Sequence, residues 1–155
     1  MELKRKHSGL SLVEVMVVLL IVMVVSGFAV PQVKGMVNSY RLRSAVASAT
    51  WAIQSIRFQA LEEGYPFQVT IQSGAGISPT YQIASEPPGT ASFSNIGSAV
   101  PLSGQPVTLN QTVVLQFKPN GLVTATTGAL NNIQISYASK TSTITVSNYG
   151  NISVN

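Results

Sequence analysis

From Val15 to Val33 the chain carries no charged residue, and this run begins close to the first residue of the sequence. Its length approaches the ~20 apolar residues that an α-helix needs to cross a bilayer. A helix of this kind is too apolar on every side to pack within a small soluble domain. We therefore expect this stretch to be buried in lipid or among other protein subunits.

The residues that flank the apolar run give it a direction. Lys4, Arg5 and Lys6 precede it, and basic residues before a spanning segment favour a cytoplasmic N-terminus. Glu14 stands immediately before the run. An acid at the centre of a membrane helix costs roughly 2.5–3.5 kcal/mol, and the shallow position of Glu14 lowers that cost.

Two interpretations of the run remain open. In the first, it is a secretory signal peptide, with Val15–Val25 as the hydrophobic region and Gly27-Phe28-Ala29 as the cleavage site. In the second, it is retained as a membrane helix. The acid at position 14 and the helical pattern that follows the run favour the second interpretation.

An amphipathic stripe continues the apolar run without an obvious linker. Its apolar members recur at helical spacing: Leu42, Val46, Ala49, Ile53, Ile56 and Ala60. One helix is therefore predicted from about Leu10 to Glu63, with Gly64 as the residue that ends it. Gly27 and Pro31 are predicted to bend this helix.

After the helix the hydrophobic period changes from 3.6 to 2, which predicts β-strands. The predicted strands are Phe67–Ile71, Tyr81–Ile83, Val113–Phe117, Ile133–Tyr137 and Thr143–Val146. The stretch Glu86–Pro106, rich in Pro, Gly, Ser and Ala, is predicted to be a long loop with a short hairpin at most. The expected fold class is α+β, a long N-terminal helix packed on a C-terminal antiparallel β-sheet domain.

The composition argues against an enzyme. The chain has no Cys and no Asp, and its single histidine is His7. We therefore expect no catalytic residues, no metal, no cofactor and no small-molecule substrate. The net charge of +4 comes partly from Lys4–Lys6, and Lys118 and Lys140 are isolated in the sequence. Nucleic-acid binding is therefore not expected.

The N-terminal pattern resembles that of the type IV pilin-like superfamily. A short basic leader ends at Gly9 and is followed by Leu10-Ser-Leu-Val-Glu14, which is similar to the prepilin peptidase motif. Further on, Phe117–Gly121 and the strands Ile133–Tyr137 and Thr143–Val146 resemble the C-terminal half of the GspH/FimT family. That family contains the H-type minor pseudopilins of type II secretion and related minor pilins.

The resemblance implies a pilin fold with four segments. These are a leader peptide (1–9), a transmembrane and filament-core helix (10–33), the amphipathic second half of the helix (34–63) and a periplasmic β-rich domain (64–155). It implies that prepilin peptidase cleaves between Gly9 and Leu10 and that the new amino group on Leu10 is methylated. Glu14 would form an assembly salt bridge with the first residue of a neighbouring subunit, and Pro31 would correspond to the family's helix kink.

The resemblance also implies a location and partners. The chain would sit in the bacterial inner membrane as a single-pass protein, with its C-terminal domain in the periplasm. It would then join a type IV pilus or a type II secretion pseudopilus near the tip, with other pilin subunits and the inner-membrane assembly platform as partners. The alternatives are a major pilin, or an exported β-rich adhesion or binding module with an ordinary signal peptide. Some minor pilins take up DNA through basic residues near the C-terminus, but Gly150–Asn155 contains no Lys or Arg.

Overall fold

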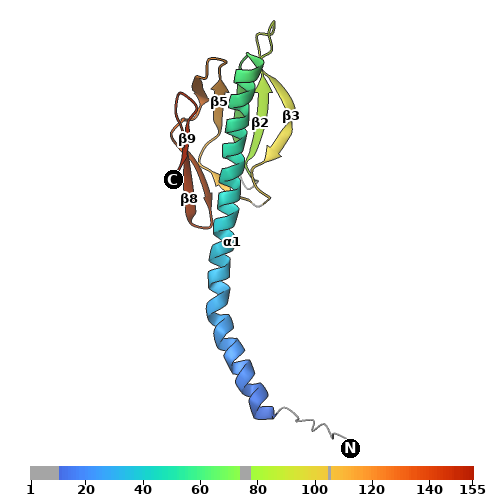
Figure 1. The fold of residues 1–155 in the computed structure, drawn as a ribbon, viewed down its shortest axis with the longest axis vertical. Helices are drawn as coiled ribbons and strands as arrows, with labels where there is room; N and C mark the ends of the chain where they lie inside the picture. Colours follow the sequence, from blue (N-terminus) through green and yellow to red (C-terminus); the bar gives the residue numbers. More distant parts are fainter. Residues whose placement is uncertain (1–10, 74–77, 105) are drawn as a thin grey trace, which may run out of the picture. The chain divides into compact units, whose positions relative to one another are not determined.

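The computed structural model describes residues 11–73, 78–104 and 106–155. The chain divides into two compact units, of which the first ends at Val37 and the second comprises Asn38–Asn155. Within these described residues, one helix, α1 (Leu12–Glu63), contributes to both units, and nine strands follow it (Figure 1). The predicted class, α+β with a long N-terminal helix and antiparallel sheets, is confirmed, and the fold is pilin-like.

The limits of α1 follow from its sequence. The helix ends at Glu63, and Gly64 then adopts φ +75°, the left-handed conformation that commonly terminates helices. The predicted C-terminus is thus confirmed. Gly27 and Pro31 both lie inside the helix, which is uninterrupted through them (Figure 1). Pro31 has no backbone N–H, so it cannot donate the usual hydrogen bond within the helix. The bend at Gly27 and Pro31 remains a prediction.

The strands of the second unit form two antiparallel sheets. The first has the order β3-β2-β1-β5-β6 and the second the order β4-β7-β8-β9. Their bounds are β1 (Phe67–Gln72), β2 (Thr80–Ser85), β3 (Ser94–Pro101), β4 (Thr108–Leu109), β5 (Val113–Phe117), β6 (Val123–Thr127), β7 (Ile133–Tyr137), β8 (Lys140–Val146) and β9 (Ile152–Val154). The five predicted strands are confirmed as β1, β2, β5, β7 and β8; β3, β4, β6 and β9 were not predicted.

The core of the second unit lies between the C-terminal half of α1 and the two sheets. All six residues of the predicted helical stripe are buried in it, with Ile53 and Ile56 fully enclosed. Alanines at positions 45, 49, 52 and 60 share that buried face and allow the helix backbone to approach the strands closely. Burying an isoleucine stabilises the fold by about 1.5–3 kcal/mol, so this stripe is what attaches α1 to the strands.

The prediction for Glu86–Pro106 was wrong, because Ser94–Pro101 forms the strand β3 at the edge of the first sheet. All eight residues of β3 are exposed, so no apolar alternation marks the strand in the sequence. Its register against β2 shifts between Tyr81 and Ile83, and Gly97 has φ +70°. The Gln82 side-chain amide donates to the carbonyls of Ile96 and Gly97, both at 3.2 Å, and holds this irregular segment in place.

The hairpin between β7 and β8 turns through two residues with positive φ. Ala138 has φ +46° and Ser139 has φ +68°, and neither is a glycine. Contacts with α1 hold both ends of the turn: Arg41 Nη1 donates to the Tyr137 hydroxyl at 2.7 Å, and Lys140 Nζ donates to Ser39 Oγ at 2.6 Å. Tertiary contacts therefore support a turn whose own residues do not favour its conformation.

Replacing the turn with Asn-Gly should stabilise the second unit. Asn and Gly are the residues that two-residue hairpin turns of this conformation prefer, and left-handed backbone costs other residues about 1–2 kcal/mol each. We expect Ala138→Asn combined with Ser139→Gly to raise the free energy of unfolding by about 1–2 kcal/mol. Chemical denaturation followed by circular dichroism would measure this change. Ser153→Gly, in the extended strand β9, is the control, and it should lower the free energy of unfolding. Equal effects of Ser139→Gly and Ser153→Gly on the free energy of unfolding would contradict the explanation.

Candidate assembly site on the N-terminal helix

Glu14 occupies the first turn of α1, where an acidic side chain is favoured by the positive end of the helix dipole. The helix is already established there, since Val15 N–H donates to the Ser11 carbonyl at 3.2 Å. Glu14 borders a shallow groove of about 220 Å³ together with Val15, Val18 and Leu19. Its carboxylate is therefore presented at the side of the helix, next to apolar side chains.

Glu14 lacks a nearby basic residue along its own helix. The first basic residue after it is Lys34, about 30 Å further along at 1.5 Å per residue. The carboxylate is exposed and so needs no partner while it is in water or among lipid headgroups. If the surrounding apolar surface becomes buried, the charge requires a cation from another molecule.

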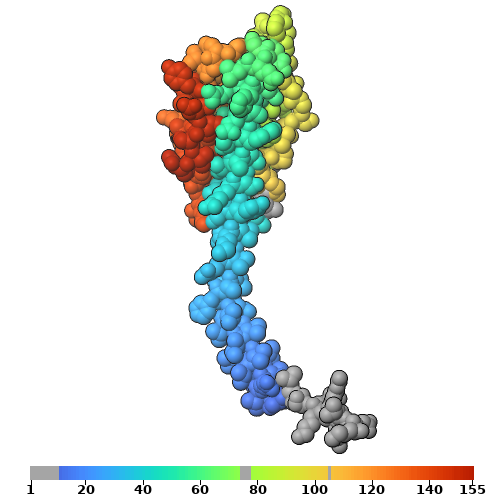
Figure 2. All heavy atoms as spheres, in the orientation of Figure 1, coloured from blue at the N-terminus to red at the C-terminus, as the bar shows by residue number. Residues whose placement is uncertain are grey.

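The residues that follow Glu14 form an apolar surface that surrounds the helix. The large apolar side chains between Leu12 and Val33 are about half exposed or more. A segment of this helix is long and apolar enough to cross a membrane, and the rest of the described chain buries none of it. Figure 2 shows this part of α1 as a column of uncovered side chains. An apolar surface of this size marks a membrane or protein contact.

The structure describes only some of the predicted site residues. Gly9 and Leu10, the predicted cleavage and methylation positions, lie outside the described residues. Glu14, Gly27 and Pro31 all lie on α1, and the last two are within the apolar surface. The cleavage, methylation, salt-bridge and kink assignments therefore remain predictions.

A comparison with protein families identifies the same segment. The family described as the prokaryotic N-terminal methylation motif matches residues 4–30, which include Gly9, Leu10 and Glu14. The comparisons with curated proteins and with solved structures found no match.

The motif and the fold together define a class of protein. A methylation motif at residues 4–30, a long apolar N-terminal helix and the antiparallel sheets after it are consistent with a type IV pilin-like protein. The proteins of that family are structural rather than catalytic. Such a motif implies processing by prepilin peptidase and assembly with other pilin subunits, and the apolar helix indicates membrane anchoring.

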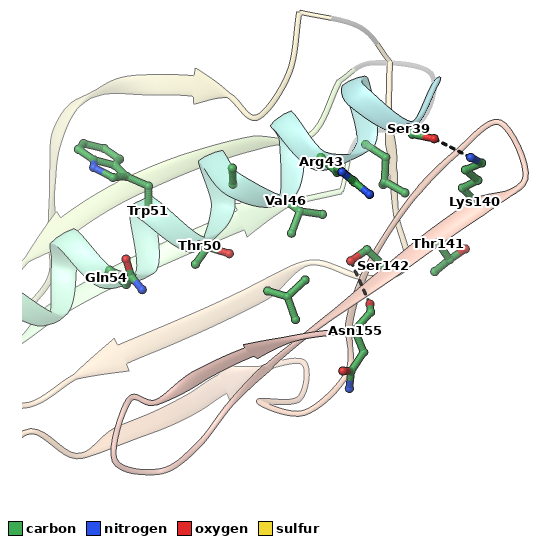
Figure 3. A pocket seen from close by; sticks show the side chains of 13 residues that line it. Ser39, Arg43, Val46, Thr50, Trp51, Gln54, Lys140, Thr141, Ser142 and Asn155 are labelled. Carbon is green, nitrogen blue, oxygen red and sulfur yellow. Dashed lines mark hydrogen bonds between the residues drawn. The ribbon is translucent and has the colours of Figure 1, made fainter. Parts of the chain in front are cut away.

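Two features of the second unit were not foreseen from the sequence. Lys140, which is isolated in the sequence, lies beside α1 and contributes to the same groove as Arg43 (Figure 3). Trp51 and Phe58, both on α1, are 61% and 70% exposed. No local pattern marks the first feature, because 101 residues separate Lys140 from Ser39.

Proposed function

We propose that this chain is a minor pilin or minor pseudopilin of the GspH/FimT type, a structural subunit of a type IV pilus or a type II secretion pseudopilus. The observation that carries the proposal is the exposed carboxylate of Glu14, for which the described residues supply no ion pair, at the start of an uncovered apolar helix. In a filament, the helices of neighbouring subunits would cover the apolar surface, and the amino terminus of a neighbouring subunit would provide a cation for the carboxylate.

The same geometry suggests an order of events. Before assembly, the subunit lies in the inner membrane with its N-terminus in the cytoplasm. The exposed Glu14 carboxylate is then among the lipid headgroups, where the free-energy cost of a charge is modest. Prepilin peptidase removes residues 1–9, and the amino group of Leu10 is methylated. On entering the filament the Glu14 carboxylate leaves water, and its new ion pair compensates for the lost hydration.

The resemblance of the C-terminal strands supports a minor rather than a major subunit, located at or near the filament tip. A major pilin is the alternative, and its abundance in sheared filaments would distinguish it. A minor subunit should be a small fraction of the sheared material, whereas a major pilin should dominate it.

Mass spectrometry of the mature N-terminus tests the proposed processing. We expect the purified mature protein to begin at Leu10 with one methyl group on its α-amino nitrogen. In cells without prepilin peptidase, the chain should keep its leader. A mature chain that begins at Val30 would instead indicate an ordinary signal peptide and an exported β-rich adhesion or binding module.

A further inference from the structure

A groove of about 840 Å³ runs along α1 in the second unit, with the second sheet as its opposite wall (Figure 3). Residues of α1 from Ser39 to Gln54 form one wall, and Lys140–Ser142 of β8 with Val154 and Asn155 form the other. The α1 wall extends over about 22 Å at 1.5 Å per residue. An extended segment of about seven residues has the same length.

The strand β9 borders this groove with an unpaired edge. Thr143 and Asn155 exchange both backbone hydrogen bonds, and Ser147 N–H donates to the Asn151 carbonyl. Because hydrogen-bonded pairs alternate along an antiparallel ladder, the N–H and C=O groups of Ile152 and Val154 point away from β8. β9 is the last strand of its sheet, so among the described residues no strand accepts these groups.

The groove is apolar inside and has one basic side chain on each wall. Leu42, Val46 and Val154 supply apolar surface, and Val154 is 46% exposed. Arg43 and Lys140 are exposed at the groove, and none of the residues that line it is acidic. Lys140 is oriented by its hydrogen bond to Ser39, whereas Arg43 has no hydrogen bond or ion pair within the described part of the chain.

We propose that this groove accepts an extended, acidic segment of a neighbouring subunit, which adds a strand to the free edge of β9. Backbone hydrogen bonds to Ile152 and Val154 would provide affinity, and apolar side chains on one face of the segment would contact Leu42, Val46 and Val154. A carboxylate on the segment would pair with Arg43 or Lys140. The basic side chains of the groove favour an acidic occupant.

The inference rests on the proposed function only in naming a neighbouring filament subunit as the source of the segment. The edge, the groove and its charge are properties of the second unit alone. A peptide-binding experiment can therefore fail while the processing of the N-terminus is as proposed, and the two failures can be distinguished.

The test uses the full chain in nanodiscs of neutral phosphatidylcholine, which offer no anionic lipid to compete. The probe is a fluorescein-labelled octapeptide of alternating Val and Thr with glutamate at two positions. Fluorescence anisotropy should show saturable binding. The same peptide with lysine in place of glutamate should bind measurably more weakly, by up to about fivefold, since an exposed ion pair contributes up to ~1 kcal/mol.

Variants of the protein separate the strand edge from the charge. Val154→Pro removes one outward N–H without removing a bond to β8, so peptide binding should be lost while circular dichroism and thermal unfolding stay unchanged. Arg43→Gln and Lys140→Gln should each weaken binding by a few-fold. Lys118→Gln is the matched control, because it removes one exposed positive charge outside the groove and should leave binding unchanged.

Three results would overturn the proposal. The first is equal binding of the glutamate and lysine peptides. The second is undiminished binding by a folded Val154→Pro variant. The third is self-association of the chain that Val154→Pro abolishes, because it would show that a second copy occupies the edge.

Discussion

Glu14→Leu should leave a cleaved, membrane-inserted protein that no longer enters filaments. The change removes the only acid on the apolar part of α1, so leader removal and membrane insertion should persist. In the filament, however, the amino terminus of a neighbouring subunit would be left without its counter-charge in a water-poor core. Breaking a buried ion pair by removing one partner costs about 3–5 kcal/mol, which corresponds to a loss of incorporation of about a hundredfold or more.

The measurement is an immunoblot of sheared filaments and of membranes from the same cells. Glu14→Gln isolates the charge, since glutamine keeps the length and polarity of the side chain, and it should fail almost as completely as leucine. Glu62→Gln is the matched control, because it removes an exposed acid near the other end of the same helix. Normal incorporation of both position-14 variants would disprove the assembly role of the carboxylate.

Gly150→Ala should clearly destabilise the second unit. Gly150 has φ +74°, and a Cβ atom there would lie 2.8 Å from both Cδ and Nε of Arg57. Arg57 spans from α1 to this turn, where its Nη1 donates to the Gly150 carbonyl at 3.4 Å. The backbone strain costs about 1–2 kcal/mol, and displacement of the arginine adds to it, so we expect a loss of about 2–3 kcal/mol in the free energy of unfolding.

Gly64→Ala separates the two contributions. Gly64 has φ +75°, almost the same as Gly150, but a Cβ atom there would meet nothing within 4 Å. Chemical denaturation should show a loss of about 1–2 kcal/mol for this variant, from backbone strain alone. In an Arg57→Ala background, Gly150→Ala should cost about as much as Gly64→Ala. If Gly150→Ala and Gly64→Ala cost the same free energy of unfolding in the wild-type background, the contact with Arg57 does not contribute to the cost.

The contact between Arg57 and Gly150 illustrates what sequence patterns cannot reveal. The two residues are 93 positions apart, and neither stands out in its local context. The Nε atom of Arg57 is buried without a hydrogen-bond partner in the described part of the chain, so the side chain is fixed by packing more than by polar contacts. Only the folded chain brings the helix and the β8–β9 turn together.

The strand β3 was missed for a different reason. Strand prediction relies on alternation between buried apolar and exposed polar residues, and β3 buries none of its residues. Its pairing with β2 and the Gln82 side chain determine its conformation. By contrast, β1 and β5 bury every second residue for most of their length, and the sequence predicted both.

The sequence alone determined the membrane-length apolar run, the position of Glu14, the buried stripe of α1 and its end at Glu63. These features depend on residues close together in the chain, because helical spacing and helix termination are local properties. Tertiary structure decided the pairing of the edge strand β3, the contact of Arg57 with Gly150, and the groove that Arg43 shares with Lys140. Each of these depends on segments that are distant in the sequence, and their proximity is set by the packing of the helix against two sheets.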